Sequence, residues 1–524
     1  MKAADTETCA GGGAAPEAAT FEAEVILADT EATERLGADL ALLLRPGDVV
    51  ALEGDLGAGK STLARAAVRA IADDAGLEVP SPTYTLVQSY DTTPPVAHFD
   101  LYRLGDASEL SELGFEDAAE SGVVLVEWPE RAADVLAAAN VRIQLATLPG
   151  GAGRIATITA DGPAAARIAR TLALRAFLVD AGLGTAARHR FTGDASPRRY
   201  ETVDADDSKL VLMDAPRQPA GPVIRDGLPY TRIAHIAEDV VPFVALARTL
   251  HAAGFAVPAI LRSDIEKGIL LINHLGSGSV LDDAGRPIAA RYEAAAECLA
   301  ELHAFPWPQD IPVADGIVHT VPRFDRRAMQ AEIDLLIDWF LPSRKGRKAT
   351  GDERALFEEI WSELFDELAS AETSLILRDV HSPNIIWRQQ ESGRARVGLI
   401  DFQDAMIGPS AYDLASLAQD ARVNIPAELE ASLVSTYIDR RRADRADFDA
   451  FGFERDYAIM ATQRASKILG IFVRLCERDG KPQYLRHIPR LKTYLARTLG
   501  HPSLAALRSL YADWGVLDED PGDA

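Results

Sequence analysis

The first part of the chain alternates short apolar runs with segments that have helical spacing. The runs read DVVALEG, PVAHFDLYRL, GVVLVEWPE, VRIQLATL and RIATITADG, at 48–54, 95–104, 122–130, 141–148 and 154–162. Strands that alternate with helices are typical of an α/β sheet with parallel strands. This pattern predicts an α/β domain over residues 21–162.

The pattern changes after this domain. LPGGAG at 148–153 predicts a turn between the last two strands, and a helix is expected to begin after the Gly162-Pro163 break. We predict a linker at 163–172 and a second domain over 173–524, strand-rich to about residue 280 and helical beyond it. A chain of 524 residues is too long for one ordinary core, which agrees with this division.

Residues 1–20 are rich in Ala, Gly, Pro and Thr, which predicts a disordered tail. This stretch lacks the apolar core of a signal peptide, and no apolar run reaches the ~18 residues of a membrane span. We therefore expect a cytoplasmic protein with no membrane partner. The widely spaced Cys9, Cys298 and Cys476 suggest free thiols in a reducing compartment.

The net charge of −25 and the pI of about 4.9 argue against broad electrostatic docking on nucleic acid. Such docking needs basic patches that replace the counterions of the phosphates. A nucleic-acid pathway in which a partner holds the RNA stays open.

The strongest motif follows the first apolar run. GDLGAGKST has the phosphate-loop spacing and lies between a predicted strand and a predicted helix, the context that the motif requires. Its glycines let backbone N–H groups face phosphate oxygens at a helix N-terminus. Lys60 is expected to reach the β- and γ-phosphates, and the hydroxyl of Ser61 or Thr62 to bind Mg²⁺. The predicted nucleotide-binding set is Gly54, Gly57, Ala58, Gly59, Lys60, Ser61 and Thr62.

Three further motifs follow at short spacing: SPTYTLV at 81–87, HFDLYRL at 98–104 and VEWPER at 126–131. Together with the phosphate loop, they resemble the TsaE family, the small ATPase of bacterial tRNA threonylcarbamoyladenosine synthesis. The resemblance implies ATP hydrolysis that supports a larger assembly with TsaB- and TsaD-like proteins. Because those partners would handle the tRNA, this chain is expected to meet tRNA only indirectly.

Two acids of these motifs lie at or just after predicted strand ends. Asp100 and Glu127 are candidates for Mg²⁺ binding and water positioning, with Glu127 also catalytic, because hard cations prefer oxygen ligands. The resemblance places Trp128 near the nucleotide, and Thr83 and Tyr84 in a segment beside the γ-phosphate.

The second domain carries a different constellation. LILRDVHSPNIIW at 375–387 holds Asp379 and, five residues on, Asn384, and VGLIDFQDA at 397–405 places Asp401 after an apolar run. This spacing is typical of the catalytic loop and metal site of kinases. Asp379 is expected to orient the substrate hydroxyl or accept its proton, and Asn384 and Asp401 to hold Mg²⁺ against the phosphates of ATP.

Segments that flank the catalytic loop indicate which kinase superfamily the second domain resembles. GPSAYDLASLAQDAR at 408–422 and FTGDASPRRYETV at 191–203 resemble the aminoglycoside phosphotransferase superfamily, with its bilobal protein-kinase-like fold. QRASKILGIFVRL and RDGKPQYLRHIPR sharpen the resemblance to the AmgK-like anomeric sugar kinases of cell-wall recycling. This likeness implies phosphorylation of N-acetylmuramate or N-acetylglucosamine at C1.

The chain departs from generic kinases at the phosphate-binding pair. KLVLMDAP has Met213 and Asp214 where the third strand usually carries Lys, and the following helix has Glu238 only at its start. Arg199 or Lys209 is expected to supply the missing cation. Leu377 also replaces a His that often precedes the catalytic Asp.

Other polar residues have competing interpretations. Asp413 either fixes the catalytic loop or caps a helix. Arg464 and Lys467, three apart on one helix face, meet either a sugar carboxylate or ordinary solvent and salt-bridge partners. His303 and His381 are expected to be structural, and Cys298 and Cys476 to pack as small apolar residues.

The sequence therefore predicts a bifunctional enzyme, a TsaE-like ATPase fused to an AmgK-like sugar kinase, with ATP and Mg²⁺ as cofactors. Two alternatives stay open. One is an ATPase fused to a catalytically silent kinase-fold module that recruits a partner. The other is an aminoglycoside-modifying kinase.

Overall fold

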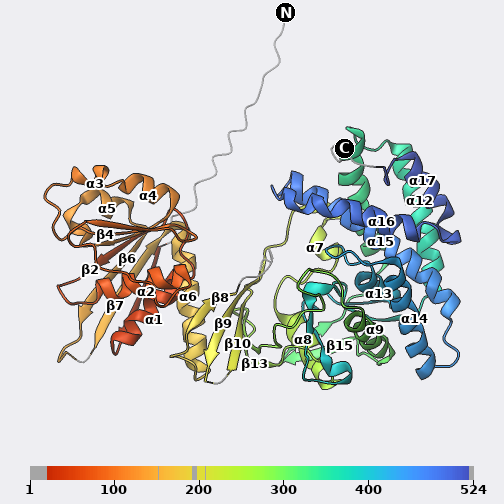
Figure 1. Cartoon of the computed structure of the whole chain (residues 1–524), viewed down its shortest axis with the longest axis horizontal. Helices are drawn as coiled ribbons and strands as arrows, with labels where there is room; N and C mark the ends of the chain where they lie inside the picture. Colours follow the sequence, from red (N-terminus) through yellow and green to blue (C-terminus); the bar gives the residue numbers. More distant parts are fainter. Residues whose placement is uncertain (1–19, 152, 192–197, 207, 519–524) are drawn as a thin grey trace, which may run out of the picture. The chain divides into compact units, whose positions relative to one another are not determined.

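The computed structural model describes residues 20–151, 153–191, 198–206 and 208–518. The tail predicted over residues 1–20 lies outside this range apart from Thr20, and so does most of the predicted nucleotide loop, at 192–197. The chain forms two compact units, residues 1–214 and 215–524. Helices and strands of each unit are labelled in Figure 1.

Unit one alternates strands and helices. Its strands are β1 (Thr20–Leu27), β2 (Val49–Glu53), β3 (Val87–Tyr90), β4 (Val96–Asp100), β5 (Val123–Glu127), β6 (Val141–Thr147), β7 (Arg154–Asp161), β8 (Arg188–Arg190), β9 (Arg199–Ala205) and β10 (Ser208–Asp214). Its helices are α1 (Thr30–Ala41), α2 (Lys60–Ala72), α3 (Glu109–Glu112), α4 (Phe115–Ser121), α5 (Ala133–Ala138) and α6 (Gly162–Asp180).

The first strands of unit one form a seven-stranded sheet in the order β1-β7-β6-β2-β5-β4-β3. The pairs β2–β5, β2–β6 and β4–β5 are parallel, which confirms the predicted α/β sheet at its centre. The edges are antiparallel, at β1–β7, β6–β7 and β3–β4. The turn predicted at 148–153 joins β6 to β7 as a hairpin, which makes this edge of the sheet antiparallel.

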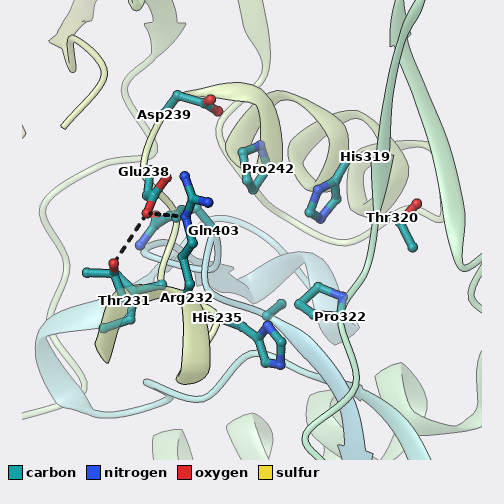
Figure 2. Close-up of a pocket in the computed structure, with 13 residues that line it drawn as sticks. Thr231, Arg232, His235, Glu238, Asp239, Pro242, His319, Thr320, Pro322 and Gln403 are labelled. Atoms are coloured by element: carbon teal, nitrogen blue, oxygen red, sulfur yellow. Dashed lines mark hydrogen bonds and ion pairs between the residues drawn. The ribbon is translucent and has the colours of Figure 1, made fainter. Parts of the chain in front are cut away.

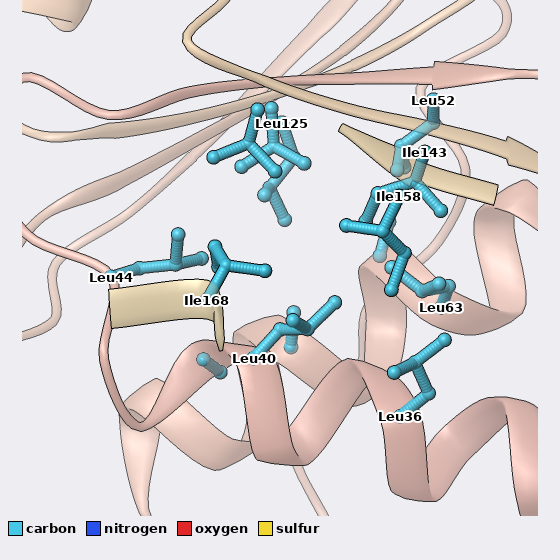
Figure 3. Packing of buried hydrophobic residues seen from close by; sticks show 14 of the residues in the cluster. Leu36, Leu40, Leu44, Leu52, Leu63, Leu125, Ile143, Ile158 and Ile168 are labelled. Carbon is cyan, nitrogen blue, oxygen red and sulfur yellow. The ribbon is translucent and has the colours of Figure 1, made fainter. Parts of the chain in front are cut away.

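Helices cover both faces of this sheet, α1, α2 and α6 on one and α3 to α5 on the other (Figure 1). Side chains of the first group interdigitate with those of the strands in the core shown in Figure 3, among them Leu36, Leu63, Leu125, Ile143 and Ile168. Gly37 of α1 lies so close to α2 that an added Cβ would be 2.5 Å from the Leu63 carbonyl oxygen. The helix that opens at the phosphate loop is therefore held by tight packing.

Helix α6 follows β7 directly and carries a row of arginines. The Arg167 guanidinium contacts Asp48 and the Leu43 carbonyl oxygen, and Arg170 Nε donates to Asp214 Oδ1 of β10 at 2.7 Å. The linker predicted at 163–172 lies inside this helix. One helix thus contacts both the large sheet and strand β10 of the same unit.

A buried charged cluster lies at the C-terminal half of α6. Asp39 of α1 accepts from Arg175 Nε at 2.6 Å and lies 3.3 Å from an Arg188 nitrogen. Arg188 Nε in turn donates to Glu201 of β9 at 2.7 Å, and its side chain is fully buried. Buried charges are tolerated only when paired in this manner. Strands β8 and β9 are therefore fixed to α1 within unit one.

Unit two begins with short strands and becomes mainly helical. Its strands are β11 (Val223–Arg225), β12 (Leu228–Pro229), β13 (Ile260–Asp264), β14 (Ile269–Asn273), β15 (Asp310–Ala314), β16 (Ile317–Thr320), β17 (Thr373–Ile376), β18 (Ile385–Trp387), β19 (Val397–Leu399) and β20 (Met406–Pro409). The hairpins β13–β14 and β15–β16 and the pairs β17–β20 and β18–β19 are antiparallel.

The helices of unit two are α7 (Tyr230–Ile233), α8 (Val241–Ala252), α9 (Ala289–Ala304), α10 (Arg326–Leu335), α11 (Leu341–Lys345), α12 (Gly351–Glu367), α13 (Ala411–Ala418), α14 (Ala427–Asp444), α15 (Ala450–Glu477), α16 (Ile488–Thr498) and α17 (Ala505–Asp513). Helix α15 packs against α10, α13 and α16 and is mostly buried. Within the described residues, none of the helices combines the length and apolar character needed to span a bilayer.

Candidate functional sites

The phosphate loop connects β2 to α2, and its backbone requires glycine. Gly54 has φ 134°, and an added Cβ would lie 2.3 Å from the Leu145 carbonyl oxygen of β6. Gly59, the residue before α2, has φ 109°. Residues with a side chain rarely adopt such backbone angles, so these glycines cannot be substituted without moving the loop. The glycines therefore keep the loop in the conformation that leads into the α2 N-terminus, where an anion such as phosphate is favourably bound.

Lys60 is the first residue of α2 and is aimed back into the loop. Its Nζ donates to the Gly54 and Asp55 carbonyl oxygens at 2.6 and 3.0 Å and lies 3.7 Å from the centre of the Trp128 ring. Burial lowers the pKa of this ammonium, although the nearby Glu127 carboxylate opposes the shift. The predicted phosphate cation is thus buried, oriented and next to the predicted tryptophan.

The two candidate acids end adjacent parallel strands. Asp100 is the last residue of β4, Glu127 is the last of β5, and the two are register partners. Ser61 Oγ donates to Glu127 Oε2 at 2.8 Å, and His98 Nε2 lies 3.0 Å from Oε1. This oxygen set of hydroxyl and carboxylates fits Mg²⁺. His98, which the sequence interpretation missed, holds Glu127 from the strand side.

The segment 81–84 is tied to Asp100. Both Ser81 and Thr83 donate their hydroxyls to Asp100 Oδ2 at 2.8 Å. Tyr84 is exposed, with the Arg103 guanidinium 4.4 Å from its ring centre. Thr83 and Ser81 therefore lie at the candidate site, whereas Tyr84 is exposed and does not line its cavity.

A cavity of about 280 Å³ is lined by Lys60, Ser61, Ser81, Thr83, Asp100, Glu127 and Trp128, together with Tyr102 and Arg154. Arg154 begins β7, is half-buried, and has no ion-pair or hydrogen-bond partner for its guanidinium among the described residues. The sequence interpretation missed Arg154, although it directly follows the glycine-rich turn that precedes β7. An unpaired cation beside the loop suits a polyphosphate ligand, so the residues present fit ATP.

The kinase-like site of unit two is built around a loop between β17 and β18. Asp413, which is fully buried on α13, accepts from the backbone N–H of Leu377 at 2.6 Å and of Arg378 at 2.9 Å. Arg378 has φ 71°, so the chain turns sharply just before Asp379. Of the two interpretations of Asp413, the structure confirms the one in which it fixes the catalytic loop.

Asp379, Asn384 and Asp401 converge as predicted. Asn384 Nδ2 donates to the Asp379 carbonyl oxygen at 2.9 Å and to Asp401 Oδ2 at 3.3 Å. Gln403 Nε2 donates to the other oxygen, Asp401 Oδ1, at 2.9 Å. Asp401 follows β19 and has φ 61°, a backbone angle that non-glycine residues rarely adopt. The side-chain oxygens of Asn384 and Asp401 thus fit a shared Mg²⁺.

Several cations surround Asp379. Burial raises the pKa of its carboxyl, but the charges of Lys467, His381, Arg378 and Arg464 outweigh burial and hold the pKa below its usual range. Asp379 therefore stays ionised near neutral pH and is available to orient or accept a proton.

The structure gives intramolecular partners to the two cations of α15. Lys467 Nζ donates to Glu332 Oε1 at 2.8 Å, and Arg464 donates to the Gln419 carbonyl oxygen at 3.2 Å. Glu332 also pairs with Arg378. The salt-bridge interpretation of Lys467 is therefore confirmed, while neither cation is exposed to solvent.

The expected strand-three position is occupied by an ion pair within unit one. Asp214 contacts Arg170 of α6 and lies 3.0 Å from an Arg199 nitrogen. In unit two, Glu238 lies before α8 and pairs with Arg232 at 3.4 Å. The absence of the usual Lys thus coincides with a local acid whose charge two arginines balance.

His303, His381 and the two described cysteines of unit two have the contacts of structural residues. His303 is buried, with Nδ1 2.9 Å from the Tyr437 hydroxyl, and His381 Nδ1 lies 2.9 Å from the Asp379 carbonyl oxygen. Cys298 is buried and Cys476 half-buried, and both are free thiols. Cys9 lies outside the described residues.

Comparison with known proteins separates the same two regions. The sequence model of the family "Threonylcarbamoyl adenosine biosynthesis protein TsaE" matches residues 27–152, and that of the "Phosphotransferase enzyme family" matches residues 188–451. A tRNA threonylcarbamoyladenosine biosynthesis protein TsaE from Rickettsia felis is 38% identical over 125 residues, or 24% of this chain and 72% of the relative.

The remainder resembles curated sugar kinases. An N-acetylmuramate/N-acetylglucosamine kinase from Caulobacter vibrioides is 34% identical over 355 residues, which cover 65% of this chain and 96% of the relative. One from Pseudomonas putida is 30% identical over 341 residues, 64% of this chain and 89% of the relative. The chain belongs to both families. It is a fusion of a TsaE-like ATPase region with an ATP-using phosphotransferase region, as the sequence predicted.

Proposed function

We propose that this chain is a bifunctional enzyme. Its phosphotransferase region would transfer the γ-phosphoryl group of ATP to the anomeric hydroxyl of N-acetylmuramate or N-acetylglucosamine. Its TsaE-like region would hydrolyse ATP in support of tRNA threonylcarbamoyladenosine synthesis. The observation that carries the kinase half is the convergence of Asp379, Asn384 and Asp401 on a loop that Asp413 anchors.

The chemistry of the kinase half follows from this loop. An anomeric hydroxyl is more acidic than an ordinary alcohol, so the ionised Asp379 is sufficient to orient it and accept its proton. The anomeric oxygen bonds to the γ-phosphorus while the bond to the β–γ bridging oxygen breaks. Asn384 and Asp401 would hold Mg²⁺, which supplies charge neutralisation on the phosphates when bound.

The cation that meets the phosphates in the kinase half is Arg199 in this proposal. It is held near Asp214, its side chain is 39% exposed, and it begins the strand after the predicted nucleotide loop. Because Arg170 also contacts Asp214, the charge of that carboxylate is neutralised even when Arg199 contacts a phosphate.

The kinase half is tested by incubating the full chain with Mg-ATP and a panel of acceptors. N-acetylmuramate and N-acetylglucosamine are expected to give 1-phosphates by NMR. The methyl glycoside of N-acetylglucosamine is the matched control, because its anomeric oxygen is blocked, and it should give no product. A 6-phosphate, or transfer only to aminoglycosides, would show that the anomeric assignment is wrong.

A second candidate rests on one observation, the acid at position 214 where kinases carry Lys. In this alternative the second region is catalytically silent and recruits a partner. The anchored loop favours catalysis, because a silent module would have no need to bring Asp379, Asn384 and Asp401 together. Failure to phosphorylate any acceptor, with ATP binding also lost, would favour the silent module.

The ATPase half is supported by the cavity that Lys60, Ser61, Asp100 and Glu127 line. In this role the chain acts with TsaB- and TsaD-like proteins. Glu127→Gln keeps the side-chain volume but removes the negative charge of the carboxylate that accepts the Ser61 hydrogen bond and faces the predicted metal site. It is expected to reduce partner-stimulated ATP hydrolysis strongly, and unchanged hydrolysis would remove Glu127 from the mechanism.

With a net charge of −25, the chain alone should bind tRNA weakly at physiological salt. A filter-binding titration measures this directly. Tight binding that weakens steeply with salt would contradict the view that partners hold the tRNA.

A further inference from the structure

Unit two contains a cavity of about 410 Å³ beside the metal-binding loop. Its walls come from three segments far apart in the sequence, 231–242, 319–322 and 403–405, as Figure 2 shows. This volume lies within the range of about 300–1,000 Å³ that small-molecule sites occupy. We call this cavity the Gln403 pocket.

Gln403 connects the pocket to the reaction site. Its Nε2 donates to Asp401 Oδ1 at 2.9 Å, and only 4% of the residue is exposed. Because a carboxylate only accepts hydrogen bonds, the amide nitrogen must face Asp401, and the amide oxygen is left for another donor. Within the described part of the chain, that Oε1 has no hydrogen-bond partner. This oxygen is an acceptor at the pocket wall, which suits a ligand that donates an O–H or N–H group.

A second polar atom lacks a partner on the opposite wall. His319 of β16 lines the pocket, and no described residue hydrogen-bonds its Nε2. Burial lowers the pKa of this imidazole, which keeps it neutral and able to donate or accept. Two unsatisfied groups of different chemistry therefore lie on walls contributed by different segments.

The third wall is fixed to the catalytic loop. Arg378, next to Asp379, donates to the Ala234 carbonyl oxygen at 2.9 Å, and the Ala237 N–H donates to Asp404 Oδ1 at 2.7 Å. His235, between these anchors, has φ 53°, a backbone angle that non-glycine residues rarely adopt. The wall is thus held in a strained conformation by bonds to both functional loops.

We propose that the Gln403 pocket receives the acceptor sugar of the kinase reaction, with Gln403 Oε1 accepting a hydrogen bond from a sugar hydroxyl or acetamido N–H. This inference rests on the proposed sugar kinase activity. The pocket is lined by neutral polar groups, by the Arg232–Glu238 pair and by the Asp239 carboxylate, which together suit a small polyhydroxylated ligand. His319 and Thr320 provide the opposing polar contacts.

The test compares two substitutions on neighbouring residues of β16. His319→Phe fills the pocket from its half-buried side, whereas Val318→Phe adds the same ring at a side chain that is 56% exposed. His319→Phe is expected to raise the sugar KM at least about 10-fold and leave the KM for ATP within twofold. Val318→Phe should change neither value.

His319→Gln separates loss of the pocket from loss of the fold, since it keeps a polar group of similar reach and should restore much of the sugar KM. Unchanged sugar KM in His319→Phe, with wild-type turnover intact, would overturn the pocket assignment while the sugar kinase function stands. A rise in the KM for ATP alone would also overturn it.

Sugar binding measured without ATP, by saturation-transfer NMR, distinguishes the remaining cases. Sugar binding that His319→Phe abolishes, in a chain with no sugar phosphorylation, would support the pocket and overturn the proposed activity. Absence of both turnover and binding in the wild-type chain would overturn both.

Discussion

The phosphate loop of unit one and the Asp379 loop of unit two hold their functional groups by different means. In unit one, backbone geometry positions the site. Positive φ angles at Gly54 and Gly59 shape the loop, and Asp100 and Glu127 end two paired strands. In unit two, side chains fix the site, because Asp413, Asn384 and Gln403 bond the residues around Asp379 and Asp401. A backbone-built site tolerates few changes in the loop, whereas a side-chain-built site depends on distant supporting residues.

The two sites also differ in their phosphate cation. Lys60 is held in the phosphate loop, whereas the phosphotransferase region matched over 188–451 has Asp214, paired with Arg170 and Arg199, where kinases usually carry Lys. We therefore expect substitutions of single cations to affect the first site more severely than the second.

The largest expected effect is at Lys60. Lys60→Ala should reduce ATP hydrolysis by the TsaE-like region about 10³-fold or more, because it removes the charge that meets the transferred phosphate. Sugar phosphorylation should be unchanged. Arg69→Ala, on the same helix but bonded to the Leu77 carbonyl oxygen, is the control and should leave both activities intact. Equal loss of both activities in Lys60→Ala would break the comparison, because the sites would not be separable.

Asp379→Asn should reduce sugar phosphorylation about 10²- to 10³-fold with little change in ATP affinity, since it removes the proton acceptor but keeps the shape. Asp401→Asn should instead weaken Mg-ATP binding, which calorimetry measures. If Asp379→Asn weakened ATP binding as much as Asp401→Asn, the separate roles assigned to these acids would be wrong.

Asp413→Ala should reduce kinase turnover about 10-fold and lower the stability of unit two by about 2 kcal/mol, because two buried N–H groups lose a charged acceptor. Asp413→Asn restores one acceptor oxygen and should recover part of both losses. Thermal unfolding and steady-state kinetics measure these effects. Full turnover in Asp413→Ala would show that the side-chain supports of this loop are dispensable.

The smallest expected effect is at Arg154. Arg154→Ala should raise the KM for ATP in the TsaE-like region about 10-fold, or about 1.4 kcal/mol, with kcat nearly unchanged. The half-buried guanidinium lines the nucleotide cavity but lies outside the catalytic oxygen set. A large loss of kcat would instead make Arg154 a group that acts in the transition state.

Local patterns were sufficient to predict much of both sites. The phosphate loop, the strand-end acids and the Asp379–Asn384–Asp401 spacing are each encoded in one short stretch, and the structure brings each set together. The glycine-rich turn at 148–153 was also visible in the sequence, and it makes β7 antiparallel to β6.

Long-range pairing was beyond local patterns. Lys467 is paired with Glu332, which is 135 residues away, so the sequence left its sugar and salt-bridge roles open. The choice between two roles for Asp413 depended on N–H groups from a segment 35 residues earlier. The Gln403 pocket combines three separate segments, and no periodicity or spacing predicts such a cavity.

Helix α6 limits where this chain can be divided into two stable parts. Its arginines contact Asp48 beside β2, Asp39 of α1 and Asp214 of β10, so one helix satisfies acids on both sides of the original junction. A later split of the gene within this helix would leave carboxylates without partners in at least one of the two products. Each product left with unpaired buried carboxylates is expected to be less stable than the intact unit, because a buried charge without a partner is costly.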